Sequence, residues 1–91
     1  MPLGDVREYR RWVDREAPSL AARRVARSFV AELGDEPWRH PSVPIEALSN
    51  QPEFEVREAA LPVEGQRHPV NVWYRHTYAT GIVDLIAITD R

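Results

Sequence analysis

The C-terminal half of the chain holds side chains of the types that cleave an RNA phosphodiester. Attack by a ribose 2′-hydroxyl needs a base for its proton, an acid for the leaving oxygen and cations for the developing charge. Imidazole, phenol, carboxyl and guanidinium groups can fill these roles. The candidates are His76, Tyr78, Arg75, Arg57, Glu58 and Arg91.

Strand geometry limits which of these side chains can meet. Alternate residues of a strand point to opposite faces, so His76 and Tyr78 share a face with Tyr74, whereas Arg75 faces away. A compact catalytic site would therefore need Arg57 from a neighbouring strand or Arg91 from the last residues. The candidate catalytic set is His76, Arg57, Tyr78 and Arg91.

The same residues also fit a structural interpretation, which we favour. In it, Tyr74 and Tyr78 pack against helices and His76 is a half-buried neutral imidazole. The arginines pair across strands with acidic side chains. Those acids are Glu55, Glu58 and Asp84.

Metal and cofactor chemistry find little support. His40, His68 and His76 lie far apart, and none has a second ligand at the short spacing of a metal motif. The chain has no cysteine, which excludes disulfides, thiolate zinc sites and cysteine nucleophiles. There is no Gly-rich phosphate loop and no dinucleotide fingerprint. We expect neither a metal nor a cofactor.

The charges divide unevenly along the chain. All 12 basic residues are arginine; residues 1–39 carry eight of them against seven acids, and residues 40–91 carry four against seven. Binding to a phosphate backbone requires concentrated positive charge. The sequence offers such charge only as a patch on its N-terminal half.

Two amphipathic helices are predicted in that half. Asp5 and Glu8 resemble a capping box, and the first helix should stop near Ala17 because Pro18 disfavours helical backbone in the preceding residue. A second helix should follow Ser19 and end at Leu33, with Gly34 as the C′ residue. Its apolar stripe is Ala22, Val25, Ala26, Phe29, Val30 and Leu33. Its solvated face is a candidate partner-binding surface formed by Arg23, Arg24 and Arg27.

Residues 35–52 hold four prolines and are predicted to cross the domain as a loop, with a short helical turn at 45–48. Trp38 in this loop has two interpretations. We favour a hydrophobic plug that holds the loop to the core, and the alternative is an exposed anchor for a partner.

Three strands are predicted after the loop, at 54–63, 70–78 and 81–89, because these stretches are rich in β-branched and aromatic residues. Residues 82–88 are apolar on both faces apart from Asp84, which predicts a central strand. Gly81 should allow a hairpin between the last two strands. The expected fold is an α+β single domain over residues 1–91, a helical hairpin packed on a three-stranded antiparallel sheet. Without a signal peptide or an apolar span, we expect a cytoplasmic protein that does not enter membranes.

Positions along most of the chain carry a family resemblance. They are Pro18, Ala21, Ala22, Leu33, Pro37, Leu48, Val56, Arg57, Glu58, Val72, Trp73, Tyr74, residues 82–88 and Arg91. Their order resembles the RelE/ParE superfamily of toxins from bacterial toxin–antitoxin systems. The resemblance implies a growth inhibitor that targets DNA gyrase or acts as a ribosome-dependent, metal-independent mRNA endoribonuclease. It also implies a cognate antitoxin that wraps the toxin.

Three departures separate the chain from that family. The first strand of the family is missing here or reduced to a stub, so we expect an unpaired sheet edge that is covered either in a homodimer or by a strand donated by the antitoxin. The family's common arginine falls on Asn71, and the sheet half is acidic. These departures favour a gyrase-type target over RNA. The alternative from another class is a non-enzymatic interaction module, such as a small phage or accessory inhibitor.

Overall fold

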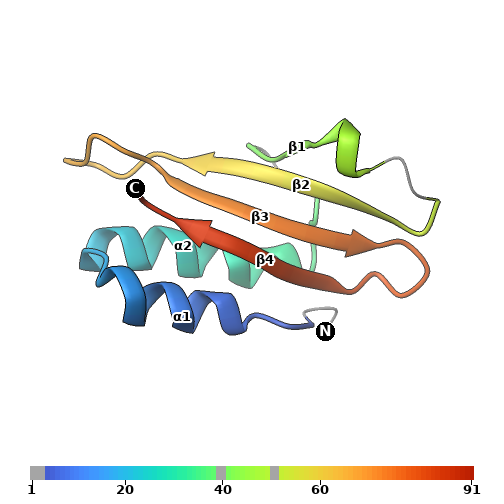
Figure 1. Ribbon diagram of the computed structural model, residues 1–91, viewed down its shortest axis with the longest axis horizontal. Helices are drawn as coiled ribbons and strands as arrows, with labels where there is room; N and C mark the ends of the chain where they lie inside the picture. The colour runs from blue at the N-terminus through green and yellow to red at the C-terminus, as the bar shows by residue number, and fades with distance from the viewer. Residues whose placement is uncertain (1–3, 39–40, 50–51) are drawn as a thin grey trace.

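The computed structural model describes residues 4–38, 41–49 and 52–91. Two helices cover one face of an antiparallel sheet, and the short β1 and η1 segments lie at its β2 edge (Figure 1). The α+β class predicted from the sequence is confirmed. The elements are α1 (Arg7–Glu16), α2 (Leu20–Leu33), β1 (Val43–Pro44), η1 (Glu46–Leu48), β2 (Phe54–Leu61), β3 (Val70–Thr77) and β4 (Val83–Thr89).

Helix α1 begins at Arg7 and is capped differently from the prediction. The carboxylate of Asp5 accepts hydrogen bonds from the Arg7 backbone N–H at 3.0 Å and from its guanidinium, while Glu8 pairs with Arg11 instead of reaching back. The capping box is therefore wrong. The predicted stop is confirmed, because Ala17 takes a left-handed conformation with φ 44° directly before Pro18.

Helix α2 spans the predicted residues. The Ser19 hydroxyl accepts a hydrogen bond from the Ala22 N–H at 3.1 Å, which satisfies one of the free donors of the first turn. The helix ends at Leu33 as predicted. Gly34 follows in a right-handed conformation with φ −60°, so this helix end does not use the freedom of glycine.

The sheet has four strands in the order β1-β2-β3-β4 rather than the three predicted. The additional strand, β1, lies in the proline-rich loop and pairs with β2 through Val43 opposite Glu58 and Pro44 opposite Arg57. Proline is tolerated there because β1 is an edge strand. The 3₁₀ turn η1 falls within the helical turn predicted at 45–48.

The central position belongs to β3, which pairs with β2 on one side and β4 on the other. The prediction that residues 82–88 form the central strand is wrong. One face of β4 is nevertheless buried, because α1 packs along this strand. A bulge between Trp73 and Tyr74 also turns Ile86 outward, which breaks the simple alternation of the strand.

The outer edge of β4 is partly covered by the segment before α1. The Gly4 N–H donates to the Val83 carbonyl at 2.7 Å, and the Leu85 N–H donates to the Asp5 carbonyl at 2.8 Å. A Cβ on Gly4 would collide with the Asp84 carboxylate, so the close approach needs glycine. The stub thus lies along the edge that was expected to be unpaired. This covering reduces the physical ground for the predicted homodimer.

The core lies between the helices and the sheet. Trp12 and Tyr74 are its largest fully buried side chains, and Phe29 meets the Tyr74 ring edge-on at 6.1 Å. The β3–β4 hairpin closes as predicted, with Gly81 at φ 71°. Among the described residues, none belongs to a helix with the length and apolar character that crossing a membrane requires.

Candidate functional site

Glu55 is the centre of a polar cluster on the helix-covered face of the sheet. The β2–β3 register sets Glu55 opposite His76 and Arg57 opposite Tyr74. One carboxylate oxygen, Oε1, accepts from Arg57 Nη1 at 3.3 Å and lies 3.6 Å from His76 Nδ1. The other, Oε2, accepts from the Tyr78 hydroxyl at 3.4 Å. We call Glu55, Arg57, His76 and Tyr78 the Glu55 cluster.

Arg57 is buried and its guanidinium is engaged on several sides. Nε donates to the Ser42 hydroxyl at 3.0 Å and Nη2 donates to the Ser42 carbonyl at 2.9 Å, in addition to the bond with Glu55. A guanidinium with this many partners cannot turn toward a phosphate without leaving buried acceptors unpaired. Arg57 therefore holds the loop and the carboxylate in place.

His76 is 9% exposed and packs between aromatic side chains. Its ring meets Tyr78 edge-on at 5.5 Å and lies 6.2 Å from the ring of Trp38. Nδ1 faces Glu55, is buried and has no hydrogen-bond partner in the described part of the chain. A carboxylate beside one ring nitrogen is the arrangement that orients a general base.

Trp38 and Tyr78 form the exposed margin of the cluster. Trp38 is 61% exposed and Tyr78 is 50% exposed. The predicted plug is wrong, because only part of the Trp38 ring is covered; the alternative of an exposed anchor matches its exposure. Partial burial, the charge of Glu55 and the hydrogen bond to it raise the pKa of Tyr78, which keeps the phenol protonated.

Arg91 lies at the other end of the sheet. Its guanidinium donates to the Glu16 carbonyl at 3.2 Å, close to the end of β4 where Thr89 pairs with Asn71. His76 is five residues further along β3, a distance of roughly 17 Å. The structure therefore brings together three of the four candidate catalytic residues and separates Arg91 from them.

The structural interpretation accounts for several of these positions. Tyr74 is fully buried and its hydroxyl donates to the Pro37 carbonyl, and burial raises the pKa of this phenol. Arg75 pairs across strands with Asp84 at 3.0 Å as predicted. Glu58, however, accepts from Trp73 Nε1 rather than from an arginine. Tyr78 does not pack beneath the helices.

The three candidate partner-binding arginines lie on one side of α2. Arg24 and Arg27 are exposed, whereas Arg23 is half-buried and its Nε has no hydrogen-bond partner within the described residues. The prediction of a uniformly solvated face is therefore wrong for Arg23. All three line a groove between α1 and α2.

Glu55 is the member of the cluster that the sequence did not assign to a catalytic site. Its place opposite His76 follows from the register of β2 and β3, which the eight-residue connection at 62–69 does not reveal. The available signal was the alternation that puts Glu55 and Arg57 on one face. In the ranges 4–38, 41–49 and 52–91, no group of three or more His, Cys, Asp or Glu side chains is placed to hold a metal ion.

Comparison of the chain with models of protein families, with curated proteins and with solved structures finds no match.

Proposed function

We propose that the protein is a toxin-like inhibitor of the RelE/ParE type that acts by binding a protein target rather than by cleaving RNA. The main support for this proposal is that Arg57, the only arginine of the Glu55 cluster, is buried and already donates hydrogen bonds to Ser42 and Glu55. A phosphodiester transition state needs a free cation, and this cluster does not present one. DNA gyrase is the target that the ParE branch implies.

The order of elements supports the same proposal. A helical pair precedes a meander of antiparallel strands, and the Gly4–Asp5 stub lies along β4 where a first strand would add to the sheet. The acidic balance of residues 40–91 also suits a protein target better than a polyanion.

Induced expression in bacteria tests this function. Growth should stop, the purified protein should inhibit DNA supercoiling by gyrase, and cellular messages should stay intact. A His76→Asn variant should still arrest growth, since the imidazole has no chemical role in this mechanism. Normal growth of cells producing the soluble wild-type protein would refute the proposal and favour a non-enzymatic interaction module.

Ribosome-dependent mRNA cleavage is the second candidate, favoured by the contact between Glu55 and His76. With Glu55 orienting the ring, His76 would take the 2′-hydroxyl proton, and the exposed Trp38 would stack on a base. Here the His76→Asn variant should lose both the cut messages and the growth arrest. Arrest without cut messages would eliminate this candidate.

A cognate antitoxin is the partner that a toxin-like function requires. Co-purification from the native host should recover a small protein that restores growth when it is produced together with this chain. If the chain instead binds another protein without affecting growth, the interaction module is the better description.

A further inference from the structure

A groove of about 1210 Å³ runs between α1 and α2 and reaches the segment before α1. Its apolar lining comes from both helices and from the turn before α1. These residues are Val6, Tyr9, Val13, Leu20, Val30 and Ala31. Its charged lining is formed mainly by arginines. These are Arg7, Arg10, Arg23, Arg24 and Arg27. We call this surface the interhelical groove.

The groove exists because the two helices rest on different strands. Helix α1 packs on β4 and α2 packs on β3, and the helices make few direct contacts with each other. Helix α2 therefore has one face toward the sheet and another toward the groove. One buries Ala26, Phe29 and Leu33 against the sheet, and the other turns residues at helical spacing from Leu20 to Ala31 toward the groove.

The apolar part of the groove is incompletely covered. Leu20 is 55% exposed at one end, and Tyr9 and Val13 are only partly buried against the core. Covering an exposed leucine and its partly buried apolar neighbours with another apolar surface lowers the free energy, because apolar area is removed from water. The surface therefore suits apolar side chains of a partner.

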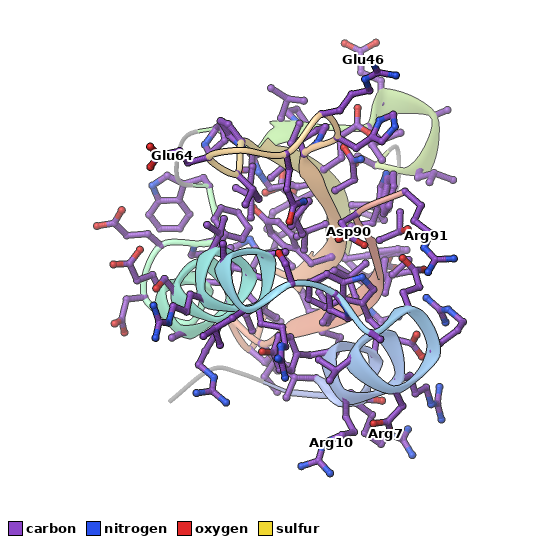
Figure 2. The ribbon with its side chains drawn as sticks, turned by 90° about the vertical axis from the view of Figure 1, so that its left-hand side faces the viewer. Arg7, Arg10, Glu46, Glu64, Asp90 and Arg91 are labelled. Carbon is purple, nitrogen blue, oxygen red and sulfur yellow. The ribbon has the colours of Figure 1, made fainter. Side chains whose placement is uncertain are left out.

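The charge of the groove is strongly positive. Asp5 is the only acid among the described residues that line it, and Arg7 already pairs with that carboxylate at 2.7 Å. Hydrogen bonds from Arg7 hold the pKa of Asp5 well below its usual range, so this carboxylate stays ionised and occupied. Figure 2 shows Arg7 and Arg10 projecting from α1 away from the sheet, whereas Arg91 lies above α1 in that view.

The remaining arginines have no acidic partner in the part of the chain that the structure describes. Arg10, Arg24 and Arg27 are exposed and form no ion pair there. Arg23 Nε is covered by neighbouring atoms and has no acceptor among the described residues. An incoming carboxylate would instead counter the charge of Arg10, Arg24 and Arg27, which are open to solvent.

We propose that the interhelical groove binds an acidic amphipathic helix of a partner protein. The lining of α2 from Leu20 to Ala31 matches a helix of about three turns, since each turn advances about 5.4 Å. The apolar stripe of the bound helix lies on Leu20, Val13 and their neighbours. Its flanking Asp and Glu side chains reach the arginines, whose planar guanidinium groups pair with carboxylates through two hydrogen bonds.

A nucleic acid fits the same surface less well. Much of the apolar lining consists of valine, leucine and alanine side chains, which form no hydrogen bonds with sugars and phosphates. Single-stranded nucleic acids need exposed aromatic rings for stacking, and the one aromatic residue here, Tyr9, is tied through its hydroxyl to the Arg23 carbonyl. The net charge of −2 further weakens attraction to a polyanion.

This inference deepens the proposed function, on which it rests only for the idea that the protein binds proteins. Its test uses purified protein and needs no toxicity, so growth assays and binding assays can fail independently. The probe is a hydrocarbon-stapled helical peptide of about 14 residues with leucines on one stripe and glutamates beside it. A peptide with glutamine in place of each glutamate is its matched control.

Fluorescence anisotropy should show binding of the glutamate peptide that is at least about tenfold tighter than that of the glutamine peptide. The Arg24→Glu, Arg27→Glu double variant should weaken binding by at least about tenfold. Arg67→Glu, at an exposed loop position outside the groove, should leave binding unchanged apart from a small effect of net charge. Added salt should weaken the wild-type complex.

Amide shifts in NMR spectra should locate the bound peptide at residues 6–13 and 20–31, even if the double variant proves poorly folded. Equal affinity for the two peptides, no binding of either, or shifts confined to another surface would overturn the proposal. So would a single-stranded RNA of similar length that binds at the same residues more tightly than the acidic peptide.

Discussion

The bond between Glu55 and Arg57 is the most direct place to test whether the polar cluster is held together by its carboxylate. Glu55→Gln removes the charge at nearly constant shape, and Arg57→Met removes the guanidinium and keeps a long apolar side chain. Because the side chains are only 15% and 11% exposed, each single change leaves a largely buried polar group without its counter-charge.

The expected loss is worked from burial and distance. Breaking a fully buried ion pair by removing one partner costs about 3–5 kcal/mol. The 3.3 Å separation of Arg57 Nη1 and Glu55 Oε1 is longer than that of a strong charge-assisted bond, and Ser42 still satisfies two guanidinium donors. We therefore expect each single variant to lose about 2–3 kcal/mol, and the pair to show a coupling energy of about 1–2 kcal/mol.

Urea denaturation followed by circular dichroism measures these changes. A domain of this size has a free energy of unfolding of about 5–14 kcal/mol, so the single variants should remain folded. The matched control is the more exposed pair Arg75 and Asp84, at 3.0 Å with side chains 47% and 22% exposed. A cycle through Arg75→Met and Asp84→Asn should give a coupling of less than about 1 kcal/mol.

The comparison of the two cycles decides the question. A coupling energy for Glu55 and Arg57 no larger than that of the exposed pair would refute the reasoning. It would mean that Ser42 alone positions Arg57 and that Glu55 does not organise the cluster.

Three further changes test the helices. Ser19→Ala should lower the free energy of unfolding by about 1 kcal/mol, because it removes the N-terminal cap of α2. The control Ser28→Ala, on the exposed part of the same helix, should change the free energy of unfolding little. If both variants behave alike in urea titrations, the cap is unimportant. Ala17→Gly should be neutral or stabilising by up to about 1 kcal/mol, because glycine adopts the left-handed conformation at this position without strain. Ala31→Gly, within α2, should lower the free energy of unfolding by about 1 kcal/mol. Equal losses of the two variants in thermal unfolding would contradict this expectation. Glu16→Gln should flatten the fall in stability below pH 4.5. Burial alone would raise the pKa of this carboxyl, but its hydrogen bonds lower the pKa overall, so the stabilisation from Glu16 is present above the unfolded pKa and is lost as the pH falls. Identical acid unfolding profiles for wild type and variant would refute the assignment.

The helices and the strand meander were predictable because local rules and tertiary packing agree there. The apolar stripe of α2 coincides with its buried face, and Pro18 ends the first helix where its steric effect requires. Gly81 supplies the positive φ that the hairpin needs. In each case the deciding interaction lies within a few residues of the chain.

The errors occur where a contact between distant residues decides the structure. The apolar pattern of residues 82–88 was taken to mean a central strand, but α1 and the Gly4–Asp5 stub cover that edge instead. β1 was missed because prolines normally break strands, and only an outermost strand accepts Pro44. The size of Trp38 predicts burial, yet its side chain is largely exposed next to Pro37, whose carbonyl accepts a hydrogen bond from Tyr74.

The candidate site was predictable in part. Strand alternation put His76 and Tyr78 on one face and required an arginine from the next strand, and Arg57 occupies that place. The place of Glu55 beside His76 follows from the β2–β3 register, which the sequence does not reveal. The position of Arg91, at the far end of the sheet from His76, follows from the length of β4. The interhelical groove depends on how far apart two helices rest on the sheet, a distance that no local pattern in α1 or α2 determines.

The pairing of α1 with β4 also fixes an order of events during synthesis. Trp12 is fully buried beside the strand that is made some seventy residues later, and its indole N–H donates to Asp90 across a separation of 78 residues at 3.4 Å. Until β4 emerges from the ribosome, the apolar face of α1 has nothing to pack on. Contacts between residues so far apart in sequence slow folding, and the interhelical groove takes its final form only after β4 has been translated and α1 has packed on it.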